Sequence, residues 1–78
     1  MNNLEMLIER EIRDDFKSSG FSKEYYVESM EMIRNKKEYM DSGLLDLVIE
    51  LDDDKVLCLS DIEENIVYGV WDRIKDSL

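Results

Sequence analysis

The chain has 78 residues, with 20 Asp or Glu, 10 Lys or Arg and no His, which gives a formal net charge of −10. This length predicts one domain over residues 1–78. The charge disfavours direct binding to nucleic acid or to a membrane, because phosphate groups are bound by Lys and Arg, and it favours a basic protein as the partner.

The absence of histidine and the single cysteine exclude several classes of site. Ser-His and Cys-His catalysis need an imidazole base, and zinc sites built from Cys and His need more of both ligands. Cys58 lies within an aliphatic run, so we expect a buried structural thiol. One free cysteine fits a reducing compartment, and Glu5, Glu9 and Arg10 argue against a signal peptide or a membrane span near the start of the chain. We therefore expect a cytoplasmic protein.

The first half of the chain predicts two amphipathic helices. Over residues 3–18, apolar residues recur at every third or fourth position and so share one face. Ser22 is a candidate N-cap for a second helix over residues 23–40. An alternative ends that helix near Asn35 and makes residues 37–40 a short strand. The second helix carries Tyr and Met residues that suit either a core or an interface, namely Tyr25, Tyr26, Tyr39, Met30, Met32 and Met40.

The next segment predicts a β-hairpin. Residues 44–51 are apolar at every second position, as in a half-buried strand, and the aliphatic run that contains Val56 and Cys58 predicts a second strand. A two-residue turn at Asp53-Asp54 would place Ile49 opposite Cys58. In that register Val56 also lies on the buried face.

Ser60-Asp61-Ile62-Glu63 matches a capping box and predicts the start of a third helix. Gly69 lies inside this helix, either because another backbone approaches closely or because glycine is tolerated there. Together the elements predict a small α+β domain in the order helix–helix–hairpin–helix (ααββα). We expect the helices to pack on a small antiparallel sheet.

Most of the excess negative charge lies between Gly43 and Glu64. Eight acids minus one base, Lys55, give this segment −7 of the total of −10. We expect these acids to form a partner-binding surface. They are Asp46, Glu50, Asp52, Asp53, Asp54, Asp61, Glu63 and Glu64.

Catalytic and metal-binding roles for these acids are disfavoured. An EF-hand calcium loop that began at Asp52 would need a ligand at Val56 and a glycine at Leu57. Acid–base catalysis by paired carboxylates needs a substrate cleft, whereas these acids fall on an expected exposed turn and helix start. We therefore expect no catalytic residue, no metal site and no cofactor, and hence a protein that is not an enzyme.

The charge pattern leads to a functional hypothesis of a small inhibitor or regulator. Carboxylates spaced along a hairpin can imitate backbone phosphates, so the expected partner is a basic, nucleic-acid-binding protein. Anti-defence proteins of phages and immunity proteins are of this kind. The alternative is a structural or regulatory homodimer, which would associate through a strand edge or through the Tyr/Met face of the second helix.

Overall fold

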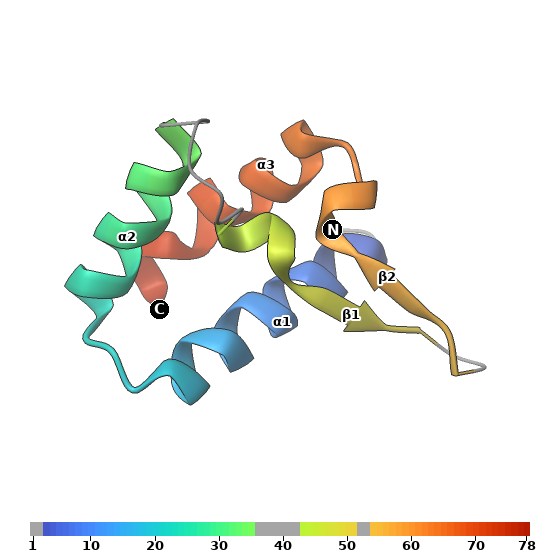
Figure 1. Ribbon diagram of the computed structural model, residues 1–78, viewed down its shortest axis with the longest axis horizontal. Helices are drawn as coiled ribbons and strands as arrows, with labels where there is room; N and C mark the ends of the chain where they lie inside the picture. Colours follow the sequence, from blue (N-terminus) through green and yellow to red (C-terminus); the bar gives the residue numbers. More distant parts are fainter. Residues whose placement is uncertain (1–2, 36–42, 52–53) are drawn as a thin grey trace.

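The computed structural model describes residues 3–35, 43–51 and 54–78, and Figure 1 shows α2 at one end of the molecule and the hairpin at the other. The elements in chain order are α1 (Asn3–Ser19), α2 (Lys23–Asn35), the 3-10 helix η1 (Gly43–Asp46), β1 (Val48–Glu50), β2 (Val56–Cys58), the 3-10 helix η3 (Leu59–Asp61), α3 (Glu64–Ile74) and the 3-10 helix η4 (Lys75–Ser77). Within these described ranges, three α-helices and one antiparallel hairpin confirm the α+β class and the ααββα order.

The two N-terminal helices begin close to the predicted positions, and α1 also ends close to its predicted position. Gly20 follows α1 with a φ of 72°, a left-handed conformation that favours glycine. The Tyr25 N–H donates to Ser22 Oγ at 3.2 Å, which confirms Ser22 as the N-cap of α2. Within the described residues α2 ends at Asn35. The predicted continuation to residue 40, and the alternative strand over residues 37–40, lie outside the described residues.

The core lies where α1, α2, α3 and the inner side of the hairpin meet. Trp71 of α3 is fully buried and packs near the ring of Tyr26, with a centroid distance of 6.1 Å. The Tyr26 hydroxyl donates to Asp15 Oδ2 at 2.7 Å, so its burial leaves no unpaired polar atom. The buried residues of the core are Ile8, Ile12, Tyr26, Leu44, Ile49, Leu59, Val67, Val70, Trp71 and Ile74.

The segment before β1 differs from the predicted strand, because Gly43–Asp46 forms a 3-10 turn. Gly43 has a φ of 57°, and a Cβ at this position would lie 3.0 Å from the Ile33 side chain. The turn therefore needs glycine for two reasons, its backbone conformation and its close approach to α2. It also buries Leu44, which strict strand alternation would place on the face opposite Ile49.

The register of the hairpin differs from the prediction by one residue. Ile49 lies opposite Leu57, and Glu50 lies opposite Val56. The Leu51 N–H donates to the Lys55 carbonyl at 2.7 Å, so three residues connect the strands instead of two. The added residue turns Val56 outward, with 64% of its surface exposed, and brings Leu57 to the core side.

The capping-box prediction is wrong. Ser60 lies in η3, and α3 begins at Glu64, after an N-cap at Glu63 that makes no side-chain capping bond. The chain turns at η3 because Leu59 is fully buried there, and this places Ser60 before the helix. Apart from its chain neighbours and the backbone of its own helix, no described residue has a heavy atom within 4 Å of a Cβ built on Gly69, so Gly69 is tolerated in α3 without a close approach by another described segment.

In the part of the chain that the structure describes, no helix has the length and apolar character needed to cross a membrane.

Candidate partner-binding surface

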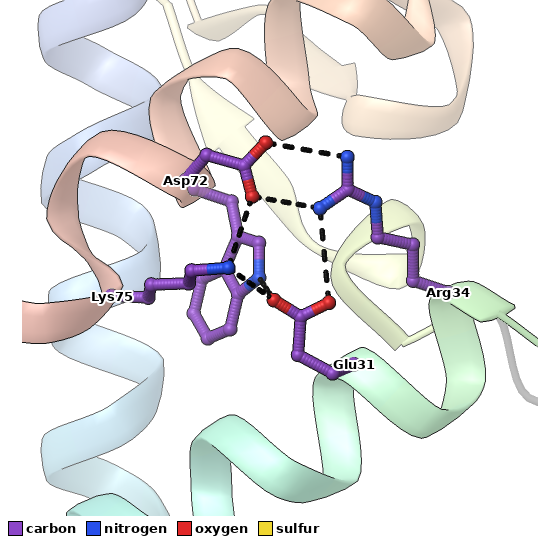
Figure 2. Close-up of polar contacts among 5 residues, drawn as sticks. Glu31, Arg34, Asp72 and Lys75 are labelled. Carbon is purple, nitrogen blue, oxygen red and sulfur yellow. Dashed lines mark hydrogen bonds and ion pairs between the residues drawn. The ribbon is translucent and has the colours of Figure 1, made fainter.

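Four charged side chains of alternating sign join α2 to α3 in a closed network (Figure 2). Arg34 donates two hydrogen bonds to the Asp72 carboxylate, at 2.7 and 3.3 Å. Lys75 donates to Glu31 at 2.7 Å and to Asp72 at 3.3 Å, and Glu31 also accepts a hydrogen bond from Trp71 Nε1 at 3.1 Å. Both cations of this network are therefore neutralised inside the molecule.

The pKa values within this network follow its hydrogen bonds. The Arg34 guanidinium holds the pKa of the Asp72 carboxyl below its usual range. The Glu31 carboxylate raises the pKa of Lys75. Arg34 also stacks over the Tyr68 ring, with 4.5 Å from the guanidinium carbon to the ring centroid. Hydrogen bonds within the protein thus favour the charged forms of Arg34, Asp72 and Lys75.

Two further cations bind the C-terminal end of the chain. Arg13 of α1 donates to the Ser77 carbonyl and hydroxyl oxygens at 3.2 and 3.1 Å, and it pairs with Glu9 at 3.4 Å. The Lys23 ammonium donates to the Asp76 carbonyl. Arg13 and Lys23 therefore connect α1 and α2 with η4. We call α1, α2, η4 and the last turns of α3 the helical end of the molecule.

The predicted partner-binding acids lie on the other part of the molecule. Those that the structure describes are all exposed, and we call this set the acidic surface: Asp46, Glu50, Asp54, Asp61, Glu63 and Glu64. They come from η1, the hairpin, η3 and the start of α3. Figure 1 shows η1 at the centre of the molecule, between α2 and the hairpin, and η3 and the start of α3 on the hairpin side of it. The remaining two predicted residues, Asp52 and Asp53, lie outside the described residues.

The acidic surface lacks the internal neutralisation found between α2 and α3. None of Glu50, Asp54, Asp61, Glu63 and Glu64 forms an ion pair with another described residue. The structure therefore pairs Glu31 and Asp72 with Arg34 and Lys75, whereas the exposed carboxylates Glu50, Asp54, Asp61, Glu63 and Glu64 form no ion pair with a described residue.

The α1 helix adds carboxylates that sequence reasoning did not assign to this surface. A groove between α1 and β1 is lined by Glu11, Asp14 and Glu50 together with Arg10. Burial raises the pKa of Glu11, and the negative charges of Asp14, Asp15 and Glu50 raise it further. The spacing of acids at positions 11, 14 and 15 could have indicated a shared helical face. That these acids lie beside Glu50 could be learned only from the tertiary structure, which places α1 next to β1.

The outer face of the hairpin is partly apolar. Val48 and Val56 are exposed, and the register places them on the same face as Glu50 and Cys58. The expectation of a buried structural thiol at Cys58 is wrong, since this residue is half-buried on the outer face. The reason is the same shift of register that turns Val56 outward.

The Tyr and Met residues of α2 divide between core and surface. Tyr26 is buried and Met30 is partly buried against the core, whereas Tyr25 and Met32 are exposed. Exposed Phe21 lies beside Tyr25, with ring centroids 4.7 Å apart. Tyr39 and Met40 lie outside the described residues.

Within the described ranges, no group of three His, Cys, Asp or Glu side chains is arranged to hold a metal ion. Comparison of the chain with protein-family models, with curated proteins and with solved structures gave no match.

Proposed function

We propose that the protein is a small, non-enzymatic binding protein of the cytoplasm, which inhibits or regulates a basic, nucleic-acid-binding protein. In this proposal the carboxylates of the acidic surface occupy the positions that backbone phosphates would take on the partner. The observation that carries the proposal is that the exposed carboxylates Glu50, Asp54, Asp61, Glu63 and Glu64 form no ion pair with a described residue, whereas Glu31 and Asp72 are paired with Arg34 and Lys75.

Acids that serve only solubility would need no particular distribution. Here Arg34 and Lys75 pair with Glu31 and Asp72 between α2 and α3, and the exposed carboxylates Glu50, Asp54, Asp61, Glu63 and Glu64 form no ion pair with a described residue. A concentration of unpaired carboxylates raises the local negative potential, which attracts a basic partner and speeds encounter with it. Val48 and Val56 add apolar contact area within the same region.

Charge reversal at matched positions tests this proposal. The test variant carries Glu50→Lys, Asp61→Lys and Glu63→Lys on the acidic surface. The control variant carries Glu24→Lys, Glu28→Lys and Asp76→Lys at exposed acids of the helical end, with the same change in net charge. Each protein is used as bait for affinity capture from a cell lysate, and bound proteins are eluted with salt or with duplex DNA.

We expect the natural chain and the control variant to capture a basic protein that elutes with salt and with DNA, and we expect the test variant to lose it. Equal loss with both variants would show that net charge alone governs binding. A captured protein that DNA does not displace would contradict phosphate imitation.

A homodimer is the second candidate, and the exposed pair of Phe21 and Tyr25 together with exposed Met32 is the observation that favours it. Aromatic and Met side chains are enriched at interfaces. Sedimentation equilibrium at micromolar concentration separates the two candidates, because a molecular mass equal to that of the monomer would exclude the homodimer.

A further inference from the structure

The free edge of β1 carries backbone groups that no described residue binds. Leu47 and Leu51 take part in hydrogen bonds between the strands, with Leu59 and Lys55 respectively. Antiparallel pairs alternate between bonded and non-bonded positions, so Val48 and Glu50 occupy the non-bonded positions. Their N–H and C=O groups therefore point away from β2, toward the outer edge of β1.

This edge borders the groove between α1 and β1. The lining residues include Val48 and Glu50 on one side and Leu7, Glu11 and Asp14 on the other. A strand laid along β1 would therefore have the backbone of β1 on one side and the side chains of α1 on the other. Such an arrangement supplies both main-chain hydrogen bonds and side-chain selectivity, the two features of recognition by strand addition.

The charge of the groove indicates what kind of segment it would accept. Three carboxylates, those of Glu11, Asp14 and Glu50, lie here with one guanidinium, that of Arg10. The raised pKa of Glu11 reflects its burial and the proximity of these negative charges. A Lys or Arg side chain placed among them would compensate this repulsion. A neighbouring pocket, lined by Glu50 and Leu51 as well, holds the cations Arg10, Arg13 and Lys17, whereas the groove along Val48 to Glu50 holds Arg10 as its one cation among the described residues.

We propose that β1 is the site of strand addition for an extended basic segment of the partner, which pairs with the backbone of Val48 and Glu50 and places Lys or Arg side chains between β1 and α1. This inference rests on the proposed function and adds how the partner is held. The free edge of β2 also presents non-bonded backbone groups, at Val56 and Cys58, but it is on the far side of the hairpin from β1 and this groove.

Proline substitution distinguishes the two edges. Val48→Pro removes an outward N–H and crowds the edge of β1, without removing a hydrogen bond between the strands. Val56→Pro makes the same chemical change on the edge of β2 and serves as the matched control. Both replace an exposed valine, and neither alters the charge. The probe is a nine-residue peptide of alternating Lys and Thr, titrated against each full-length protein at low salt.

We expect Val48→Pro to weaken peptide binding by about tenfold or more, and Val56→Pro to leave it within about twofold of the natural chain. Hydrogen exchange on the natural chain is a second measurement that does not depend on how the variants fold. The bound peptide should slow exchange of the Val48 and Glu50 amides and leave those of Val56 and Cys58 unchanged.

Several results would overturn strand addition at β1. One such result is that both proline variants bind the peptide equally and that the peptide does not protect the Val48 and Glu50 amides from exchange. If the charge-reversed variant Glu50→Lys, Asp61→Lys, Glu63→Lys also fails to bind, the proposed function stands and the strand-addition mode is wrong. Protection or loss of binding at Val56 would place the peptide on β2. Absence of peptide binding to the natural chain would count against both proposals.

Discussion

At the residue scale, Trp71 shows how one polar atom links the core to the surface. Its ring is fully buried, and its N–H donates to Glu31, a residue of another helix. A buried N–H without an acceptor costs about 1–3 kcal/mol, so Glu31 stabilises the packing of α2 on α3 besides pairing with Lys75. Glu31 is therefore part of the fold, in contrast to the carboxylates of the acidic surface.

Tyr26 predicts how stability depends on pH at the alkaline end. Burial raises the pKa of Tyr26 above its ordinary value of 10.0, and the hydrogen bond to Asp15 raises it further. The folded state therefore holds this proton more tightly than the unfolded state does. The resulting stabilisation is fully present below about pH 10 and is lost as the pH rises above that value.

The variant Tyr26→Phe should lose about 1 kcal/mol at neutral pH, because a hydrogen bond is removed, and should then decline less than the natural chain above about pH 10. The free energy of unfolding in urea, measured across this range, checks both effects. Tyr25→Phe is the control, since Tyr25 is exposed. Parallel pH curves for Tyr26→Phe and the natural chain would show that Tyr26 titrates normally.

At the element scale, two glycines with equally open surroundings differ in backbone conformation. Among the described residues, chain neighbours and the backbone of α3 around Gly69 aside, none has a heavy atom within 4 Å of a Cβ added to Gly20 or Gly69. Gly69 lies inside α3, where Ala loses less backbone freedom on folding. Gly20 has a φ of 72°, which strains any residue with a Cβ.

Gly69→Ala should therefore stabilise the protein by up to about 1 kcal/mol, whereas Gly20→Ala should destabilise it by about 1 kcal/mol. Chemical denaturation of the two variants beside the natural chain gives both values. Destabilisation by Gly69→Ala would indicate that α3 needs a close approach at this position after all.

At the scale of the whole molecule, the distribution of charge predicts opposite effects for two changes that remove the same charge. Glu50 lies among other carboxylates and forms no ion pair with a described residue, whereas Asp72 binds Arg34 and Lys75. Glu50→Gln should stabilise the protein by about 0.5 kcal/mol at low salt, through relief of repulsion. Asp72→Asn should destabilise it.

Both effects should shrink at high salt, because ions screen exposed charges. Urea denaturation at low and high ionic strength measures them. If Glu50→Gln were destabilising, the carboxylates near β1 would not be in mutual repulsion, and the electrostatic basis of the proposed binding surface would fail.

Only part of the candidate surface could be predicted from the sequence, because some of its features arise from neighbouring residues and others from residues that are far apart in the chain. The exposure of Glu50, Asp54 and Asp61 could be predicted from alternation and turn residues, which are local properties. The contribution of Glu11 and Asp14 could not, because it depends on α1 lying beside β1. The internal pairing of Arg34 with Asp72 likewise joins residues far apart in the sequence.

The helices, the presence of a hairpin and the excess of negative charge follow from local features of the amino-acid sequence, namely periodicity, the N-cap at Ser22 and composition. The hairpin register and the start of α3 depend instead on tertiary packing. One residue more in the connection turns Val56 and Cys58 outward, and the burial of Leu59 overrides a capping motif. Local patterns specify elements, whereas long-range packing decides which of their faces, and which of their charges, remain for a partner.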